Sequence, residues 1–127
     1  MSSDELRPWA TYAQGLEAGE LRYQRCASCS RAIFYPRLAC NWCGSTDISF
    51  QVSAGAGSIY SVTVISDRHA GPYNVVLVDL DEGFRMMSTV VGTPSDAVRI
   101  GDRVAATFDV GEDGTRRTVF VPRDEVG

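Results

Sequence analysis

The sequence predicts a mainly β protein that consists of an N-terminal helix, a small zinc-binding module and a five-stranded barrel of the OB-fold type. Two C-x-x-C pairs, Cys26/Cys29 and Cys40/Cys43, contain every cysteine of the 127-residue chain and lie ten residues apart. Five segments of alternating apolar and polar residues follow, with an insertion after the third. A segment with helical periodicity precedes the cysteine pairs and the alternating segments. The predicted boundaries are 1–20 for the helix, 21–47 for the zinc ribbon and 48–127 for the barrel.

Residues 5–19 repeat apolar side chains at helical spacing, with Pro8 suited to the first turn and Gly19 to the end of a helix. The amphipathic pattern allows two interpretations. The aromatic side chains pack the helix against the rest of the chain, or they form part of a ligand groove or a partner surface. The predicted apolar face comprises Leu6, Trp9, Ala10, Ala13 and Leu16.

The cysteine spacing predicts a tetrahedral zinc site, because each C-x-x-C turn directs two sulfurs at one ion. Four thiolates leave no coordination position for water, so the predicted zinc is structural and not catalytic. Disulfides or a redox-active pair are the alternatives. The N-terminus is acidic and lacks an apolar run, which predicts a cytoplasmic chain in a compartment that favours metal binding. Gly44 suits the turn after the second pair, whereas Ser30 at the same place in the first pair suits it less.

Around the first cysteine pair we expect short strands at 21–25 and 32–35. Ile48–Val52 alternates and is assigned to the start of the barrel. Turns are expected at 81–83 and 112–114, and a brief helical turn within 93–101. An SH3-like barrel is the alternative fold for this pattern. The barrel strands are expected at 58–65, 73–80, 84–91, 104–110 and 118–121.

The composition excludes several kinds of catalysis. All twelve basic residues are arginine, so Schiff-base chemistry and a P-loop lysine are absent. With every cysteine assigned to zinc, no thiol nucleophile remains. The one histidine, His69, lies in a polar stretch with Gly and Pro, which favours a solvated side chain over a general base. We therefore assign no catalytic residue and predict that the chain alone is not an enzyme.

Partner classes follow from charge and hydropathy. No apolar run is long enough to cross a membrane, so no membrane association is expected. An OB-fold protein that binds single-stranded nucleic acid remains an alternative, but such proteins present a basic groove. The net charge of −4 and the pI of about 4.9 argue against it. Alternating aromatic residues such as Tyr60 and Tyr73 are attributed to core packing.

Six ordered motifs extend over nearly the whole chain: Leu21–Cys29, Tyr35-Pro36-Arg37, Cys40–Ser45, Gly55–Ser61, Val76–Gly83 and Ile100-Gly101. Together they resemble those of the DUF35 family. The resemblance implies an N-terminal helix, a rubredoxin-like zinc ribbon and an OB-fold, in a protein associated with acyl-CoA. Similar members are small subunits of thiolases, acyltransferases, hydroxymethylglutaryl-CoA-forming enzymes and steroid side-chain aldolases.

Three positions depart from the family pattern. Ser30 replaces the usual glycine, and the loop from Ser66 to Pro72 is shorter than is common in the family. Only one proline, Pro36, precedes Arg37 where the family tends to have two, so only these two residues correspond. The shorter loop would reduce contacts with a ligand or partner there.

The resemblance implies a non-catalytic subunit that binds a thiolase-like enzyme and helps it handle acyl-CoA. Four arginines, at positions 22, 25, 31 and 37, surround the ribbon. Arg25 and Arg37 are candidate contacts for the phosphates of CoA. Alternatively, the arginines only keep a module with negatively charged thiolates solvated. Trp9, Tyr35 and Trp42 are candidate interface anchors, although each could instead be buried in the monomer. A stand-alone acyl-CoA-binding protein is the remaining alternative.

Overall fold

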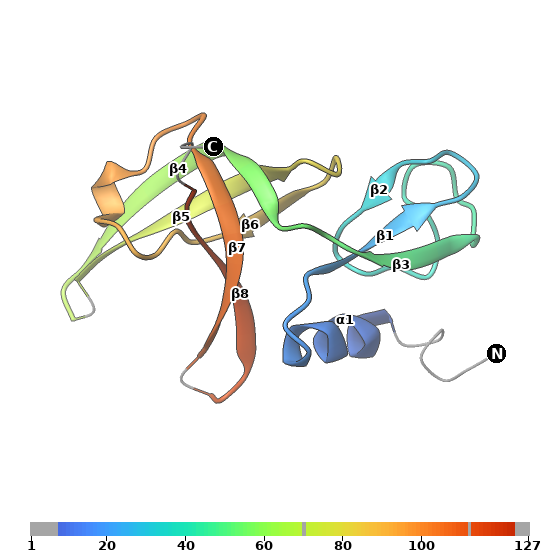
Figure 1. The fold of residues 1–127 in the computed structure, drawn as a ribbon, viewed down its shortest axis with the longest axis horizontal. Coiled ribbons are helices and arrows are strands. Elements are labelled where there is room, and N and C mark those ends of the chain that lie inside the picture. The colour runs from blue at the N-terminus through green and yellow to red at the C-terminus, as the bar shows by residue number, and fades with distance from the viewer. Residues whose placement is uncertain (1–7, 70, 112, 124–127) are drawn as a thin grey trace. The chain divides into compact units, whose positions relative to one another are not determined.

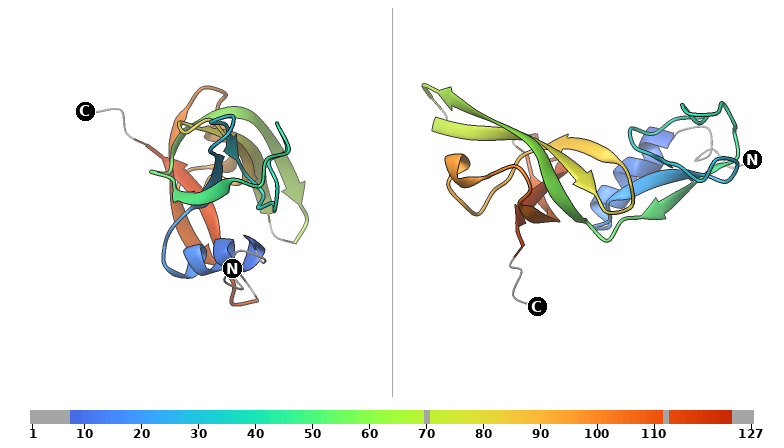
Figure 2. Two further views of the ribbon diagram at one scale, coloured as in Figure 1. Left: turned by 90° about the vertical axis from the view of Figure 1, so that its right-hand side faces the viewer. Right: turned by 90° about the horizontal axis from the view of Figure 1, so that it is seen from above.

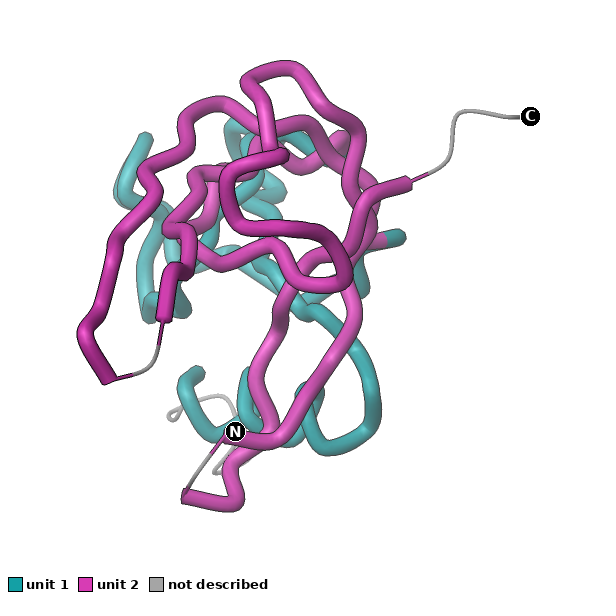
Figure 3. The backbone as a smooth tube through the Cα atoms, turned by 90° about the vertical axis from the view of Figure 1, so that its left-hand side faces the viewer, with its two compact units in different colours: residues 1–54, 82–84 teal, residues 55–81, 85–127 magenta. Residues whose placement is uncertain are grey.

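The computed structural model describes residues 8–69, 71–111 and 113–123. The chain divides into two compact units, one formed by residues 1–54 with 82–84 and the other by residues 55–81 with 85–127 (Figure 3). Each unit has its own β-sheet, and the first unit also carries the only α-helix of the described residues (Figure 1). None of the described helices combines the length and apolar character needed to cross a membrane. The predicted helix, ribbon and barrel are thus confirmed as elements of the fold.

Helix α1 spans Pro8–Glu17, with proline in its first turn as predicted. It ends in a Schellman motif around Gly19, whose φ is 75°. The Glu20 N–H donates to the Gly15 carbonyl at 2.7 Å, and the Gly19 N–H donates to the Leu16 carbonyl at 3.0 Å. The predicted helix start and Leu6 lie outside the described residues.

Arg22 connects α1 to the ribbon sheet. Its guanidinium donates to the Thr11 carbonyl at 3.0 Å and to the Glu20 carboxylate at 2.8 and 3.0 Å. A Cβ atom on Gly15 would lie 2.6 Å from Cδ of Arg22, so glycine is what allows the arginine side chain to cross the helix. The hydrogen bonds of the Arg22 side chain therefore help to hold the helix to the ribbon sheet.

The ribbon sheet has the strand order β2-β1-β3, with β1 at Arg22–Cys26, β2 at Ala32–Ile33 and β3 at Ile48–Val52. Strand β2 is shorter than predicted. Tyr35 adopts a φ of 65°, in the left-handed region, and Pro36 follows it. A left-handed residue does not continue a strand, and proline lacks the N–H that pairs with a neighbouring strand, so the chain leaves the sheet here.

Strand β3 belongs to the ribbon and not to the barrel, where the sequence analysis had assigned it. It pairs antiparallel with β1 along its whole length, from Arg22↔Val52 to Cys26↔Ile48. An alternating pattern shows that a segment is a strand but does not identify its partner. The barrel sheet instead begins at Ala56.

The barrel sheet contains the five predicted strands with the insertion after the third. All neighbouring strands pair antiparallel, in the order β6-β5-β4-β7-β8. The long β4–β5 hairpin pairs from Gly57↔Leu80 to Asp67↔Gly71 (Figure 2). The elements are β4 at Ala56–Asp67, β5 at Gly71–Leu80, β6 at Arg85–Ser88, the 3₁₀ turn η1 at Ser95–Ala97, β7 at Arg103–Val110 and β8 at Arg116–Pro122.

A parallel contact joins the two ends of this sheet. Val90, just after β6, forms a parallel bridge with Phe120 of β8. The Phe120 N–H donates to the Thr89 carbonyl at 3.0 Å, and the Val91 N–H donates to the Phe120 carbonyl at 2.8 Å. The sheet is thereby curled into a small barrel with a non-sequential closure, which is the OB-fold and not the alternative SH3-like meander.

Among the described residues of the barrel unit, Asn74 is the polar residue that is buried as a whole. Val76, Val78 and Leu80 alternate inward along β5. Asn74, which is 1% exposed, donates to the carbonyls of Val90 and Ser95 at 3.2 and 3.4 Å. Its side-chain oxygen accepts from the Val90 N–H at 2.8 Å and from the Thr89 hydroxyl at 2.9 Å. This residue fastens the insertion to the barrel without an unpaired buried group.

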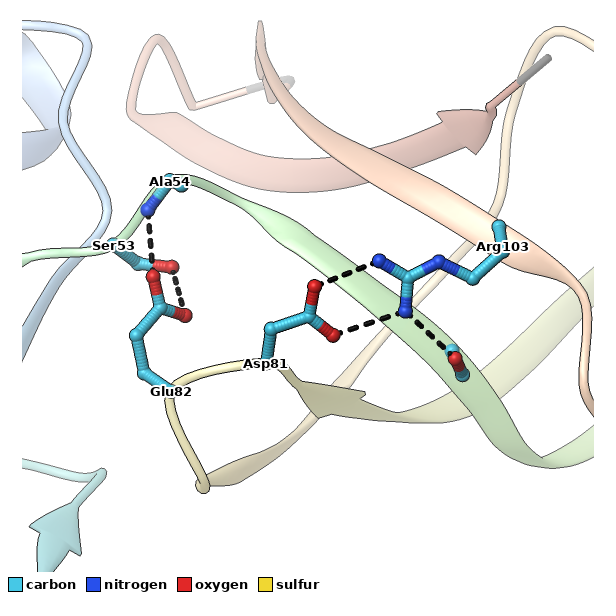
Figure 4. A network of polar contacts seen from close by, with 6 residues as sticks. Ser53, Ala54, Asp81, Glu82 and Arg103 are labelled. Atoms are coloured by element: carbon cyan, nitrogen blue, oxygen red, sulfur yellow. Dashed lines mark hydrogen bonds and ion pairs between the residues drawn. The ribbon is translucent and has the colours of Figure 1, made fainter. Parts of the chain in front are cut away.

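Two consecutive acidic residues after β5 make separate polar networks, one in each unit (Figure 4). In the barrel unit, Arg103 donates to both carboxylate oxygens of Asp81 at 2.9 and 2.7 Å and to Ser58 at 2.9 Å. The hydrogen bonds from Arg103 lower the pKa of Asp81. In the ribbon unit, the Glu82 carboxylate accepts from the Ser53 hydroxyl and the Ala54 N–H, both at 2.8 Å.

Candidate functional site

The two C-x-x-C turns share one backbone geometry. In the first, the Ser30 N–H donates to the Cys26 carbonyl at 2.8 Å, and the Cys26 N–H donates to the Arg31 carbonyl at 3.0 Å. The second turn repeats both bonds: the Gly44 N–H donates to the Cys40 carbonyl at 2.9 Å, and the Cys40 N–H donates to the Ser45 carbonyl at 2.8 Å. Equal turns present the two cysteine pairs in the same way, as a shared tetrahedral ion requires.

Ser30 is the one strained position in this repeat. Its φ is 66°, close to the 81° of the equivalent Gly44. A residue with a Cβ atom is less stable by about 1–2 kcal/mol in this left-handed region of backbone conformation, whereas glycine is not.

We expect Ser30→Gly to stabilise the zinc-loaded ribbon by about 1 kcal/mol, measured as a higher thermal unfolding midpoint. The control is Ser49→Gly, on the exposed side of β3, which should lower the stability of the ribbon because glycine weakens a strand. A lower midpoint for Ser30→Gly would contradict the assignment of strain.

The four sulfur atoms lie within 4.8 Å of one another. Those of Cys26 and Cys43 are 3.6 Å apart, and those of Cys29 and Cys40 are 3.7 Å apart. Zn–S bonds of about 2.3 Å in a regular tetrahedron give sulfur separations of roughly 3.8 Å. A disulfide needs about 2.05 Å, and all four cysteines are free thiols in the structure. The arrangement fits a zinc ion and not a pair of disulfides.

Hydrogen bonds and burial shift the pKa values of three of the thiols, those of Cys26, Cys40 and Cys43, in different directions. A bond from the Cys29 backbone, with further bonds from Cys43 and Ser28, lowers the pKa of Cys26 to about 6 despite its burial. Burial opposes ionisation of Cys40, but the backbone N–H groups of Trp42 and Cys43 outweigh it and lower the pKa. The Ser45 backbone lowers the pKa of Cys43, but its thiol neighbours and burial together raise it to about 12. Zinc binding removes these protons from the thiols.

These residues suit a structural zinc. Cys26 and Cys40 are buried against Ile33, so the ligands themselves form most of this small core. The Trp42 N–H donates to the Cys40 sulfur at 3.3 Å, as expected for a thiolate ligand. A zinc ion held by Cys26, Cys29, Cys40 and Cys43 would crosslink the two turns, and all four protein ligands would exclude a bound water.

Aromatic side chains near α1 form a connected series within the ribbon unit. Trp9 contacts Tyr12 edge-on at 5.9 Å between ring centroids, and Tyr12 contacts Phe34 at 5.7 Å. Phe34 stacks on Phe84 at 5.0 Å, and Phe84 stacks on Tyr23 at 4.9 Å. The series runs from an exposed ring to buried ones. The three predicted anchors Trp9, Tyr35 and Trp42 are 58%, 49% and 56% exposed, which makes them available to a partner.

The loop containing Tyr35 and Arg37 is held in a defined position. Gln24, buried in β1, accepts from the Arg37 N–H and donates to the Arg37 carbonyl, both at 2.8 Å. Tyr35 keeps its left-handed conformation in front of a proline, and such local strain is concentrated at functional sites. The sequence analysis did not single out Gln24, because no sequence signal identifies a glutamine that clamps a distant backbone.

Arg25 and Arg37 differ in their surroundings. Arg25 donates from Nη1 to the Ser30 carbonyl at 2.8 Å and from Nη2 to the Glu82 carbonyl at 3.1 Å. Its Nη2 also contacts the Tyr23 hydroxyl, and its Nε contacts the Gln51 side-chain oxygen, both at 3.3 Å. It therefore braces the ribbon unit internally. Arg37 is exposed on its clamped loop, and its backbone N–H and carbonyl are both bonded to Gln24.

The barrel surface contains no comparable cluster of reactive side chains among the described residues. His69 is exposed in the β4–β5 turn, where its backbone N–H donates to the Asp67 carboxylate at 2.7 Å. Tyr60 and Tyr73, which were attributed to the core, are 50% and 42% exposed because they lie on the outer side of their strands. The Arg85 guanidinium covers the Tyr60 ring at 3.5 Å, so this ring is already stacked.

Comparisons with known proteins identify both units. Residues 13–49 match the family model of the rubredoxin-like zinc ribbon domain of ChsH2, and residues 51–109 match that of its C-terminal OB-fold domain. The solved structure named "Ltp2-ChsH2(DUF35) aldolase" is 32% identical, with a TM-score of 0.81, and the match covers 91% of this chain and 94% of that one. A DUF35 protein of unknown function from Sulfolobus solfataricus, at 17% identity and a TM-score of 0.67, shows the same fold.

Curated relatives agree with this assignment. A DUF35 domain-containing scaffold protein of Methanothermobacter thermautotrophicus is 30% identical over 90% of this chain and 91% of its own length. The 3-oxo-4,17-pregnadiene-20-carboxyl-CoA hydratase alpha subunit of Mycobacterium tuberculosis is 34% identical over 85% of this chain. A probable enoyl-CoA hydratase alpha subunit of Thermomonospora curvata is 32% identical over 91% of this chain. The matched segment spans only 36% and 39% of these two alpha subunits. The zinc ribbon, the OB-fold and the nearly full-length relative together show that the chain belongs to the DUF35 family.

Proposed function

We propose that this chain is a non-catalytic accessory subunit that binds a thiolase-superfamily enzyme in the cytoplasm and helps it handle acyl-CoA thioesters. The observation that carries the proposal is the contrast within the ribbon unit. Its four clustered cysteines would fill all the coordination positions of a zinc ion, whereas large aromatic side chains of the same unit are exposed. Such a unit suits docking better than chemistry.

The relatives support an accessory role. Their names describe a scaffold protein, alpha subunits of CoA-ester hydratases and an aldolase that contains a DUF35 chain. In thiolase-type chemistry a cysteine thiolate attacks the thioester and a second group transfers protons. All four cysteines of this chain are gathered in one cluster, so we assign the nucleophile to the partner.

We assign Trp9, Tyr35 and Trp42 to the partner interface. Tryptophan and tyrosine are common anchors of protein interfaces, and a clamped loop presents Tyr35 with little loss of conformational entropy on binding. Arg37, on the same loop, is proposed to contact a CoA phosphate at the edge of this interface. Arg25 is proposed only as a secondary contact, because most of its donors are already occupied.

Co-expression with a thiolase-like enzyme of the same organism tests the proposal. Size-exclusion chromatography should show a stable complex, and the enzyme should lose activity when this chain is omitted. Trp9→Ala should weaken the complex at least about tenfold, which corresponds to roughly 1.4 kcal/mol, with zinc content unchanged. Val110→Ala is the control, because this exposed residue lies in the barrel unit.

Separate elution of the two proteins, with full enzyme activity in the absence of this chain, would refute the accessory role. Titration of the isolated chain with an acyl-CoA tests the stand-alone alternative. The proposed subunit should bind CoA more tightly when the enzyme is present, and Arg37→Ala should reduce that gain. Equal affinity with and without the enzyme would favour a stand-alone acyl-CoA-binding protein.

A further inference from the structure

A cavity of about 370 Å³ opens on the ribbon unit beside the first C-x-x-C turn. Arg25, Arg31, Trp42 and Glu82 supply its charged and aromatic side chains. Arg31 directly follows Ser30, and Trp42 lies inside the second C-x-x-C turn. The two turns therefore bring Arg31 and Trp42 together on a surface that is rigid whenever the metal centre is formed.

Arg31 and Trp42 form a stacked pair. The Trp42 indole N–H donates to the Ala32 carbonyl at 3.4 Å, which fixes the ring. The guanidinium carbon of Arg31 lies over this ring, 4.7 Å from the centroid. An arginine held by an aromatic face keeps its in-plane N–H groups for another acceptor. Trp42 remains 56% exposed beside it.

The charges around the cavity leave this guanidinium without an acidic partner. Segment 21–47 carries four arginines but only one carboxylate, that of Asp47. Arg22 pairs with Glu20, and Glu82 is engaged by Ser53 and Ala54. Among the residues that the structure describes, none makes a hydrogen bond or an ion pair with the Arg31 guanidinium.

We infer that Arg31, backed by Trp42, binds a carboxylate side chain of the partner enzyme subunit. This inference rests on the proposed function and specifies the chemistry of the contact. A carboxylate matches the planar donor fork of arginine with two parallel hydrogen bonds. The neighbouring indole excludes water from one side, which strengthens the pair. Arginine and tryptophan are also the residue types most enriched among interface hot spots.

The test uses the complex of the full chain with its enzyme. The dissociation constant is measured at low and high salt for the wild-type protein and for Arg31→Ala, Arg31→Lys and Arg68→Ala. We expect Arg31→Ala to raise the dissociation constant at least about tenfold at low salt and to reduce its salt dependence. Arg31→Lys should recover only part of the loss, because lysine lacks the planar fork. Arg68→Ala changes an exposed arginine in the barrel unit and should have less than about a twofold effect.

Three results would overturn the inference while leaving the proposed function intact. The first is a complex whose affinity is unchanged by Arg31→Ala. The second is normal association with lower zinc content, because Arg31 would then serve the thiolates. The third is normal association with weaker CoA binding, because the cavity would then hold a phosphate. A wild-type chain that forms no complex would instead refute the proposed function.

Discussion

Replacing Cys40 by serine is expected to release zinc and unfold the ribbon unit while the barrel keeps its sheet. Cys40 is 4% exposed and belongs to a core cluster whose other fully buried members are Cys26 and Ile33. Because ligands make up most of this core, losing one removes both a bond to the metal and apolar packing. Zinc contributes about 10–16 kcal/mol to the folding of small four-ligand modules, more than a core of this size supplies. The ribbon should therefore not fold without the metal.

Elemental analysis and amide hydrogen exchange measure this outcome. The wild-type protein should contain about one zinc per chain and Cys40→Ser much less, with protection lost in β1 and β3 but kept in β5 and β7. Ser28→Ala is the matched control, because this exposed serine lies inside the first turn and its hydroxyl, which the substitution removes, donates to the Ser45 hydroxyl at 3.0 Å. A Cys40→Ser protein that retains zinc and ribbon protection would contradict the prediction. So would a metal-free wild-type protein, or a disulfide within either pair in reducing buffer.

The cluster of four cysteines could be predicted from the sequence because the geometry of each pair is local. A C-x-x-C turn brings two sulfurs to one side whatever surrounds it, and only four cysteines were present to share an ion. The barrel strands could be predicted for a similar reason, since alternation with a period of two is imposed by burial of one face. Gly19 shows the same principle at a helix end, where its positive φ completes the Schellman motif.

Features that depend on which segments meet could not be predicted. The alternation of Ile48–Val52 did not show that β1 was its partner, and Tyr60 could not be placed on the outer side of β4. A bulge at this point of β4 shifts the register between Ile59 and Ser61. Likewise, the number of arginines near the cysteines did not show that Arg25 is occupied internally while Arg31 is not. Such distinctions require the tertiary contacts.

Replacing Phe120 by alanine is expected to cost the barrel about 3–5 kcal/mol. The Phe120 side chain is 0% exposed, and its backbone makes both hydrogen bonds to the segment after β6. Truncation would leave a cavity at the place where the sheet curls onto itself, where neighbouring strands cannot easily collapse to fill it. Domains have a total stability of only about 5–15 kcal/mol, so this loss would populate an open barrel.

Denaturant unfolding at a fixed zinc concentration measures the effect, with circular dichroism reporting on the barrel and zinc release reporting on the ribbon. The barrel transition should shift to a lower denaturant concentration, whereas zinc release should change little, because the metal centre has its own small core. Val110→Ala is the control: this side chain is 62% exposed and its loss should change stability by less than about 0.5 kcal/mol. If the Phe120→Ala barrel were as stable as the control, the prediction would be wrong. The parallel bridge between Val90 and residue 120 would then not depend on this side chain, and the curling of the sheet would have to come from its antiparallel strand pairs alone.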